Sequence, residues 1–280
     1  MEIQWYPGHM AKTAKILKNN IKKIDIVLEL ADARIPESSR NPDLEELIRN
    51  KDRILVLTKT DLADGKTTQK WLEWYKKKNI VAIPVVSTTS KGISNLLETI
   101  NNKKDEITDN NYRKIIKAIV VGIPNIGKST LINQLARTSK AKTGSKPGVT
   151  RGTQWITINR FIRLLDTPGI LWPKIEDKKR AVKLAFIGSI KDEILDIQAL
   201  AIELLKYLRN NDKNRLIERF KLDCVPENYY ELLESIGRTR GCLQPGNRVD
   251  ILRTAGIVLE EFRKGKLGKI SLETPEEFDS

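Results

Sequence analysis

One stretch decides the fold of this chain: Gly122-Ile123-Pro124-Asn125-Ile126-Gly127-Lys128-Ser129, which matches the phosphate-binding pattern G-x-x-x-x-G-K-[ST]. An apolar run at 115–121 precedes it and a helical pattern follows it, so a chance Gly-Lys-Ser turn is the weaker interpretation. Glycines let the backbone wrap around phosphates, and amides at the start of the following helix point at the anion. We expect a catalytic Lys128 that bridges the β- and γ-phosphates, and a Ser129 that ligates Mg²⁺. The predicted nucleotide-binding residues of this loop are Asn125, Ile126, Gly127, Lys128, Ser129 and Thr130.

Two later stretches fit nucleotide switches. Asp166-Thr167-Pro168-Gly169 follows the apolar run 161–165, and Asp166 lies 38 residues after Lys128. An Asp at the end of a strand can hold Mg²⁺ through water, and the Gly169 amide can bind the γ-phosphate and so sense its hydrolysis. Between the two motifs lies the Gly-rich stretch 146–152, in which Thr150 is the candidate second metal ligand. A plain surface loop is the alternative for Thr150.

The motif that reads the base comes earlier than the phosphate loop. Guanine specificity normally comes from Asn-Lys-x-Asp, and the match here is Thr58-Lys59-Thr60-Asp61, directly after the apolar run 53–57. We expect Asp61 to accept hydrogen bonds from the N1–H and exocyclic amine of guanine, and the stem of Lys59 to lie over the base. The hydroxyl of Thr58 can donate to guanine N7 but lacks the second bond to the phosphate loop that the usual Asn makes. This difference predicts slightly weaker nucleotide binding.

A second polar turn, Ser87-Thr88-Thr89, follows the apolar run 80–86. We expect Ser87 and Thr88 to belong to a further base-contacting loop. Both signals are weak when taken alone, and an ATPase is the alternative if Thr58 and Asp61 do not read the base.

Apolar runs alternate with helical patterns along the first part of the chain. Continuous apolar runs of this kind predict a parallel sheet with helices on both faces. Because the base-reading motif precedes the phosphate loop, the sheet is predicted to be circularly permuted, an arrangement that exposed and adjacent chain ends tolerate. The predicted fold class is therefore α/β, a circularly permuted P-loop NTPase-type sheet. The expected strands lie at 24–30, 53–57, 80–86 and 115–121.

The character of the chain changes after Trp172-Pro173, where helical spacing replaces strand-like runs. We predict a nucleotide-binding domain over 1–175 and a small all-α domain over 176–280. The acidic tail from Glu273 to Ser280 is expected to be frayed.

Composition excludes several classes of protein. The 280 residues include one His and two Cys, so neither a zinc enzyme with several His ligands nor a disulfide scaffold is expected. The sequence has no signal-peptide pattern and no apolar run near the ~20 residues of a membrane-spanning helix, which predicts a cytoplasmic protein without a membrane partner. Residues 1–177 carry 31 basic and 19 acidic side chains, against 19 and 17 in 178–280. This basic first part suggests a polyanionic partner such as nucleic acid, and a Lys-rich composition bias is the alternative.

Three further stretches resemble signatures of the ribosome biogenesis GTPase A family of circularly permuted GTPases. They are Gln4-Trp5-Tyr6-Pro7-Gly8-His9-Met10, Asp32-Ala33-Arg34-Ile35-Pro36, and Gly237-Arg238-Thr239-Arg240-Gly241 with Pro245-Gly246. The resemblance covers nearly the whole chain. It implies GTP and GDP as ligands, a role in late assembly of the large ribosomal subunit, and a C-terminal domain that contacts rRNA.

Hydrolysis is expected to be slow without help. Many GTPases orient the attacking water with a Gln after the switch glycine, whereas Ile170 occupies that position here. Asn125 matches the position that ligates K⁺ in potassium-stimulated relatives, with a loop-stabilising hydrogen bond as the alternative. The family signature implies that His9 approaches the γ-phosphate, where it can orient water; a structural or RNA-contacting role is the alternative.

Basic residues of the C-terminal domain are the candidate rRNA contacts, namely Arg238, Arg240 and Arg248. The near-neutral charge of this part weakens a purely electrostatic interpretation. The lysines at 12, 15, 18, 22 and 23 are a second candidate surface, unless they form a solvated helix face. The expected function is a GTP-dependent assembly factor that docks on rRNA of the large-subunit precursor and leaves after hydrolysis. A GTP-gated protein-binding switch that does not act on ribosomes is the alternative.

Overall fold

The structure is a computed structural model that describes residues 17–107, 115–140, 154–167, 175 and 177–279. Several predicted features lie outside these residues: the opening signature with His9, the stretch 146–152 with Thr150, and Gly169 with Ile170. The chain divides into two compact units. We call Gln4–Ile175 together with Ser271–Ser280 the sheet unit, and Glu176–Ile270 the helical unit.

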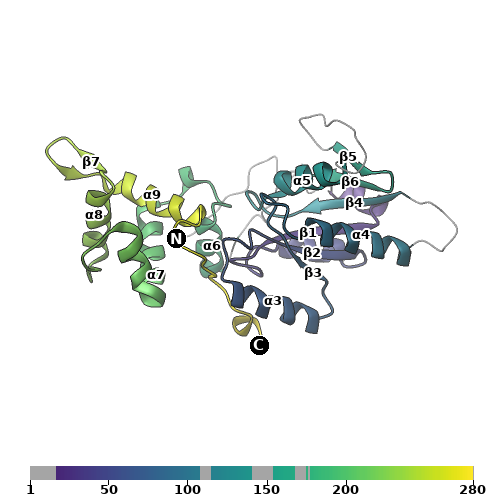
Figure 1. The fold of residues 1–280 in the computed structure, drawn as a ribbon, viewed down its shortest axis with the longest axis horizontal. Coiled ribbons are helices and arrows are strands. Elements are labelled where there is room, and N and C mark those ends of the chain that lie inside the picture. Colours follow the sequence, from purple (N-terminus) through teal and green to yellow (C-terminus); the bar gives the residue numbers. More distant parts are fainter. Residues whose placement is uncertain (1–16, 108–114, 141–153, 168–174, 176, 280) are drawn as a thin grey trace. The chain divides into compact units, whose positions relative to one another are not determined.

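The sheet unit is built on a six-stranded sheet with the strand order β3-β2-β1-β4-β6-β5 (Figure 1). Every neighbouring pair is parallel except β5 with β6, which is antiparallel. All residues of β1 are buried, as expected for a strand near the middle of a sheet that is covered on both faces. The strands are β1 (Ile26–Asp32), β2 (Asp52–Thr58), β3 (Ala82–Pro84), β4 (Ile116–Val121), β5 (Gln154–Asn159) and β6 (Ile162–Asp166).

Helices connect these strands at the positions that the sequence pattern indicates. Helix α3 buries Trp71, Trp74 and Tyr75, whose spacing of three and four residues places them on one face of the helix. Its N-terminus is capped by Asp64, whose carboxylate accepts a hydrogen bond from the Thr67 amide at 2.8 Å. The helices of this unit are α2 (Pro42–Ile48), α3 (Gly65–Lys77), α4 (Ile93–Ile107) and α5 (Lys128–Lys140).

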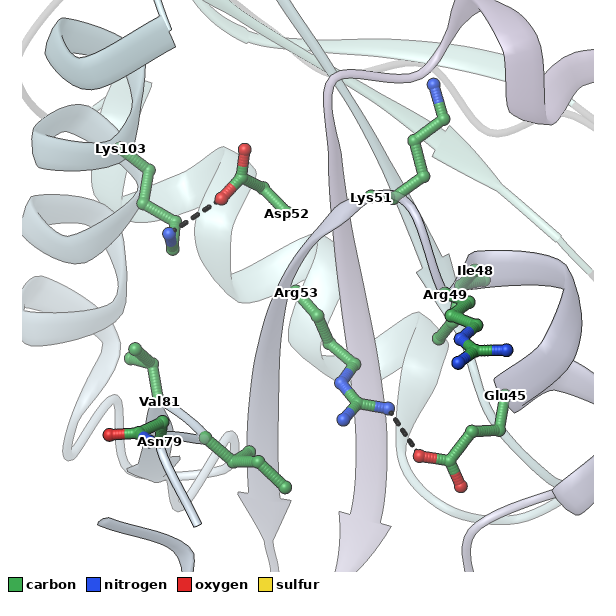
Figure 2. Close-up of a pocket in the computed structure, with 10 residues that line it drawn as sticks. Glu45, Ile48, Arg49, Lys51, Asp52, Arg53, Asn79, Val81 and Lys103 are labelled. Carbon is green, nitrogen blue, oxygen red and sulfur yellow. Dashed lines mark hydrogen bonds and ion pairs between the residues drawn. The ribbon is translucent and has the colours of Figure 1, made fainter. Parts of the chain in front are cut away.

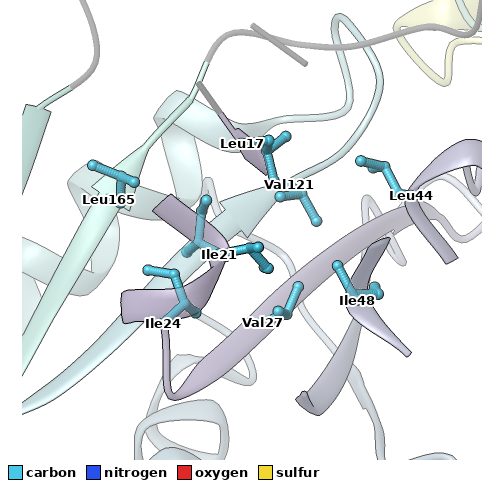
Figure 3. Packing of buried hydrophobic residues seen from close by; sticks show 9 residues of the cluster. Leu17, Ile21, Ile24, Val27, Leu44, Ile48, Val121 and Leu165 are labelled. Carbon is cyan, nitrogen blue, oxygen red and sulfur yellow. The ribbon is translucent and has the colours of Figure 1, made fainter. Parts of the chain in front are cut away.

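A hydrophobic cluster joins the first described turn of the chain to the sheet. Figure 3 shows its side chains pointing toward one another from the 17–24 segment, α2, β1, β4 and β6. Leu17 and Val27 are fully buried within it. The cluster comprises Leu17, Ile21, Ile24, Val27, Leu44, Ile48, Ile119, Val121 and Leu165.

The strand order confirms the predicted fold class and the circular permutation. The strand β2, which leads into the base-reading motif, precedes β4, which leads into the phosphate loop, and β1 lies between them in space. The strand predicted over 80–86 is shorter than expected, because regular pairing covers only Ala82–Pro84.

The helical unit contains α6 (Lys178–Phe186), α7 (Ile197–Phe220), α8 (Tyr229–Thr239) and α9 (Ile251–Arg263). It is not purely helical, because Leu243–Gln244 and Arg248–Val249 pair as a short antiparallel hairpin, β7 with β8. Helix α7 is kinked at Asp212, whose backbone leaves the helical region with φ −161° and ψ 85°. None of the described helices combines the length and the apolar character needed to cross a membrane.

The acidic tail over Glu273–Asp279 is ordered and belongs to the sheet unit, so the expectation of a frayed tail and of a helical domain that includes these residues is wrong. Glu273 is 1% exposed, and its carboxylate accepts hydrogen bonds from the amides of Glu37 and Ser38 at 3.1 and 3.2 Å. The indole N–H of Trp71 donates to the Glu273 carbonyl at 3.3 Å, and the Phe278 ring packs 5.7 Å from the Trp71 ring. The tail therefore packs against the aromatic face of α3.

Candidate nucleotide site

The carboxyl ends of four parallel strands meet at one edge of the sheet. These ends are Asp32 in β1, Thr58 in β2, Val121 in β4 and Asp166 in β6. The segments that follow them include the base-reading motif, the phosphate loop and the start of the Asp166 switch. In open α/β sheets this edge is the place where ligands bind.

The phosphate loop joins β4 to α5, as the sequence predicts. Three of its residues have positive φ angles, namely Gly122 with φ +157°, Asn125 with φ +57° and Gly127 with φ +101°. A Cβ on Gly127 would meet no atom within 4 Å, so the glycine is required by its backbone conformation rather than by space. Helix α5 begins at Lys128, which leaves Ser129 and Thr130 exposed in its first turn. The amides of this turn are suited to bind an anion.

Lys128 lies back over its own loop. Its ammonium donates hydrogen bonds to the carbonyls of Gly122 and Ile123, at 3.1 and 2.6 Å, and the residue is 8% exposed. Burial lowers the pKa of Lys128 to about 8; nearby Asp166 opposes this shift and the Lys59 charge adds to it. An anionic phosphate beside this ammonium would therefore favour its charged form.

Asp166 ends β6 next to the phosphate loop. Burial raises the pKa of its carboxyl, and the Lys128 ammonium partly opposes that shift. The following residue, Thr167, is buried and donates from its hydroxyl to the Val120 carbonyl at 2.7 Å, which fixes the start of this switch against β4.

These donors suit Mg²⁺ bound together with a nucleotide. Among the described residues, no group of three or more His, Cys, Asp or Glu side chains forms an all-protein metal site. Mg²⁺ is usually held by one or two protein oxygens, by phosphates and by water. Ser129 and Asp166 supply oxygens of that kind.

Two hydrogen bonds join the base-reading motif to the phosphate loop, although the two are far apart in sequence. The Thr58 hydroxyl contacts the Ile126 carbonyl at 2.8 Å, and the Lys59 ammonium donates to the Asn125 carbonyl at 2.7 Å. The expectation that Thr58 loses its link to the phosphate loop is therefore wrong. Its single hydroxyl hydrogen faces the Ile126 carbonyl and the Ala31 carbonyl at 3.1 Å, so guanine N7 is the partner that it forgoes.

The remaining predicted base contacts lie in turns beside this junction. Asp61 is exposed and Thr60 is half-buried, directly after Lys59. Ser87 and Thr88 lie in the turn closed by the bridge between Val86 and Lys91. The side-chain amide of Gln134, in α5, donates to the hydroxyl of Ser90, which ties this turn to the helix after the phosphate loop.

Sequence reasoning missed the role of Asp32 and Arg34, which it identified only as part of a signature. Asp32 is fully buried, pairs with Arg34 at 2.8 Å, and lies 3.2 Å from the Lys59 ammonium. Two acidic residues, Glu29 and Asp32, interrupt the apolar run of β1. A charge within a buried strand is the signal that would have revealed this contact.

A cavity of about 430 Å³ lies away from this site, where β2 begins (Figure 2). Three of the basic groups that line it have partners within the protein. Arg53 pairs with Glu45 at 3.2 Å, Lys103 pairs with Asp52 at 2.8 Å, and Lys51 donates to the Ile24 carbonyl at 2.8 Å. The cavity therefore does not compete with the strand ends as the nucleotide site.

The candidate rRNA contacts of the helical unit have different surroundings. Arg240 donates to Glu261 at 3.2 Å and lies over the Phe220 ring, so its guanidinium supports the packing of this unit. Arg238 is exposed and pairs along its helix with Glu234 at 2.8 Å, where both side chains are about half exposed to solvent. Arg248 is exposed on the β7–β8 hairpin. Arg238 and Arg248 are thus better placed than Arg240 to meet an external phosphate.

Comparisons with known proteins agree with one another, because the matching family model and the relatives are all described as GTPases associated with ribosomes. A family model described as 50S ribosome-binding GTPase matches residues 117–221. Ribosome biogenesis GTPase A of Bacillus cereus is 46% identical, covering 99% of this chain and 96% of the relative. Mitochondrial ribosome-associated GTPase 1 of Mus musculus is 34% identical, covering 96% of this chain and 90% of the relative.

Solved structures resemble the chain over nearly its full length. The crystal structure of GNP-bound YlqF from T. maritima gives a TM-score of 0.69 at 28% identity, covering 95% of this chain and 99% of that one. The GDP-bound structure of the same protein gives a TM-score of 0.69 at 29% identity, covering 93% and 99%.

Proposed function

We propose, from the premise that this chain belongs to the ribosome biogenesis GTPase A family, that it is an assembly factor that docks on rRNA of the large-subunit precursor in its GTP state and leaves after hydrolysis. The chain is a GTPase that takes part in ribosome biogenesis. Docking in the GTP state, release after hydrolysis and a cytoplasmic location are the parts that we infer.

The junction between the two nucleotide motifs carries this proposal. Thr58 and Lys59 contact the carbonyls of Ile126 and Asn125 at 2.8 and 2.7 Å, so one nucleotide can span both motifs. Asp61 would read the guanine edge, while Lys128 and the first turn of α5 would neutralise charge on the β- and γ-phosphates. Mg²⁺, held by Ser129, Asp166 and Thr150, would neutralise further phosphate charge.

The connection between the units supports coupling of hydrolysis to docking. Asp166 ends β6, and the chain continues from there into the helical unit, which begins at Glu176. A γ-phosphate contact from Gly169 would hold this connection in one state, and its loss on hydrolysis would release it. Arg238 and Arg248 are the proposed phosphate contacts of the helical unit.

Hydrolysis is proposed to be slow alone and stimulated by the ribosomal particle. His9 would orient water or donate to a phosphate oxygen, and Asn125 would ligate K⁺ near the transferred phosphate. A His9→Ala variant is expected to lose particle-stimulated hydrolysis while it retains nucleotide binding. Unchanged stimulated turnover would remove the catalytic role of His9.

Sedimentation with large-subunit precursors tests the order of events. The protein is expected to pellet with the particle in a non-hydrolysable GTP analogue and to stay in solution with GDP. Binding should weaken steeply with salt if rRNA phosphates are the partner. Salt-insensitive binding to a protein would instead support a GTP-gated protein switch, which the near-neutral charge of residues 178–280 favours.

The base specificity has its own test. Asp61→Asn removes the carboxylate that accepts from the guanine N1–H and amine, and is expected to shift preference from GTP to xanthosine triphosphate. Competition of labelled GTP by ATP and by xanthosine nucleotides, in both proteins, measures this change. Effective competition by ATP in the unchanged protein would contradict guanine reading by Asp61.

A further inference from the structure

Asp32 makes more contacts than a structural ion pair needs. It is the last residue of β1 and is fully buried, and Arg34 is 1% exposed. The Arg34 guanidinium donates to both carboxylate oxygens, from Nε to Oδ1 at 2.9 Å and from Nη2 to Oδ2 at 2.8 Å. The Arg34 amide adds a third bond to Oδ1 at 3.1 Å. This bidentate pair already balances the buried charge.

A second cation nevertheless reaches the same carboxylate from the neighbouring strand. The Lys59 ammonium lies 3.2 Å from Asp32 Oδ2, and it also donates to the Asn125 carbonyl at 2.7 Å. The ammonium is therefore held between the end of β1 and the phosphate loop. The backbone of Lys59 has a left-handed conformation, with φ +55°, which only a few per cent of non-glycine residues adopt.

The Asp32 side chain is held in its ionised form. Although burial alone would raise it, Arg34 and Lys59 together hold the pKa of Asp32 well below its usual range. The loop after Asp32 is also braced, because the Arg34 carbonyl accepts from the Leu272 amide at 2.8 Å and the Asp32 amide donates to the Ser39 hydroxyl at 2.9 Å. The carboxylate is thus a fixed point, whereas the Lys59 side chain is 26% exposed.

We propose that Asp32, oriented by Arg34, is a positioning residue for nucleotide binding: it anchors the Lys59 ammonium against the Asn125 carbonyl and so locks the base-reading motif to the phosphate loop. This inference rests on the proposed placement of the Lys59 stem over the guanine. Loss of the anchor loosens both ends of the nucleotide site together. Because the anchor does not touch the γ-phosphate side, GDP and GTP should dissociate faster by the same factor.

A double-mutant cycle tests whether Asp32 acts through Lys59. The four proteins are the unchanged chain, Asp32→Asn, Lys59→Met and the double variant; methionine keeps the stem of Lys59 and removes its charge. The measurement is the dissociation rate of fluorescent GDP and of a fluorescent non-hydrolysable GTP analogue, chased with unlabelled nucleotide. Contacting residues couple by amounts that correspond to roughly a 2- to 150-fold change. We expect about a tenfold faster release in Asp32→Asn, and no further increase when Lys59→Met is already present.

Two controls separate positioning from folding. Glu29 is a second buried carboxylate of β1, at 2% exposure, and its partners are Arg40 and Arg53 at 3.1 and 3.4 Å rather than Lys59. Glu29→Gln is expected to lower the unfolding temperature without changing nucleotide release. Because Asp32→Asn leaves Arg34 buried without its carboxylate, the cycle is repeated with the neutral pair Asp32→Asn with Arg34→Gln, which carries no unbalanced charge.

The outcomes are distinct. If Asp32→Asn accelerates release by the same factor with and without Lys59→Met, or if Glu29→Gln accelerates release equally, Asp32 acts through the fold and the inference is overturned. If Lys59→Met leaves the release rate unchanged, the Lys59 ammonium does not hold the two motifs together and the anchor is overturned, whereas the placement of the guanine over the stem, which methionine retains, is left to the Asp61→Asn competition test. Faster release in Lys59→Met together with an additive cycle overturns the anchor alone.

Discussion

At the scale of single residues, one hydroxyl hydrogen decides what Thr58 contributes to the nucleotide site. Thr58 is 1% exposed and its hydroxyl lies between the Ile126 carbonyl of the phosphate loop and the Ala31 carbonyl of β1. The residue therefore holds three segments together: the end of β1, the end of β2 and the phosphate loop. A side chain at this position contributes to the shape of the site before any nucleotide binds.

Replacing Thr58 by valine keeps its shape and removes the donor. We expect the free energy of unfolding to fall by about 1–3 kcal/mol, because buried carbonyls lose a hydrogen bond, and nucleotide affinity to fall with it. Urea denaturation measures the first effect and nucleotide titration the second. Thr157→Val, at an exposed position of β5 outside the nucleotide motifs, is the matched control and should change neither. An unaltered unfolding curve in Thr58→Val would mean that the hydroxyl does not stabilise the junction.

Lys128 should make nucleotide affinity depend on pH in alkaline solution. Burial lowers the pKa of Lys128 to about 8, and bound phosphates favour the charged form. Below pH 8 the free protein already carries the proton, so affinity stays level. Above pH 8 binding must take up a proton, so the dissociation constant rises by up to about tenfold per pH unit.

Titration of a fluorescent nucleotide from pH 7 to 9.5 checks this expectation. Lys128→Arg is the control, because arginine stays charged throughout this range and should flatten the profile. The same slope in both proteins would assign the pH dependence to the nucleotide rather than to Lys128.

Site residues that belong to one contiguous motif can be predicted from the sequence. Contacts between residues that are far apart along the chain cannot. Lys128 follows from the phosphate-loop pattern alone. The Thr58 contact spans 68 residues and the Arg240–Glu261 contact spans 21, so neither partner can be deduced from local spacing. Arginine is a residue type that commonly contacts rRNA phosphates, so the sequence suggested Arg240 as such a contact. Its position beside Phe220 depends on how the helices pack, which local sequence does not reveal.

At the scale of elements, the tail is held by α3 and by the loop after β1. Glu273 accepts two backbone N–H groups of that loop, and the indole of Trp74 donates to Asp279. The Ser271 hydroxyl accepts from the Asp64 amide at 3.1 Å, directly before α3. The tail therefore braces both the loop that follows Asp32 and the segment that follows the base-reading motif.

Glu273→Ala is expected to destabilise the sheet unit. The substitution leaves the amides of Glu37 and Ser38 without their carboxylate, which costs about 1–3 kcal/mol for each buried group left unsatisfied. Thermal unfolding of the full chain measures the loss. Glu276→Gln is the matched control, because its ion pair with Lys70 is exposed, and such pairs contribute little. Equal melting of the two variants would contradict the bracing role of Glu273.

Elements with a strong periodic pattern are predictable, and short or distant ones are not. The runs at 24–30 and 53–57 correspond closely to Ile26–Asp32 and Asp52–Thr58. Strands β7 and β8 have two residues each, too few for any alternation to register. The acidic composition of the tail predicted fraying. The aromatic residues of α3 on which the tail packs could not be recognised as its partners, because Trp71 precedes Glu273 by 202 residues.

At the scale of the whole molecule, the order of motifs along the chain was sufficient to predict the permuted sheet. Parallel strands bring the segments after β2 and β4 to the same edge whatever their order in sequence, so the permutation leaves the site intact. The division into units was less predictable at its end, because residues 271–280 return to the sheet unit. Such a return depends on packing rather than on composition.

Removing two exposed arginines should weaken the proposed rRNA docking without altering GTP hydrolysis in the absence of particles. Each phosphate contact contributes nearly one unit to the slope of log affinity against log salt concentration. Arg238→Ala with Arg248→Ala is expected to lower that slope by about 2 in sedimentation with large-subunit precursors. Lys213→Ala, at an exposed position of α7, is the control. A lower affinity with an unchanged slope would point away from phosphate contacts.

The return of the tail has a mechanical consequence. The chain passes from the sheet unit into the helical unit at Glu176 and returns at Ser271. Two segments of chain therefore connect the units, one downstream of Asp166 and one beside Asp64. A force on the helical unit is therefore transmitted through the chain both to the segment after Asp166, on the phosphate side, and to the segment before α3, which follows the base-reading motif.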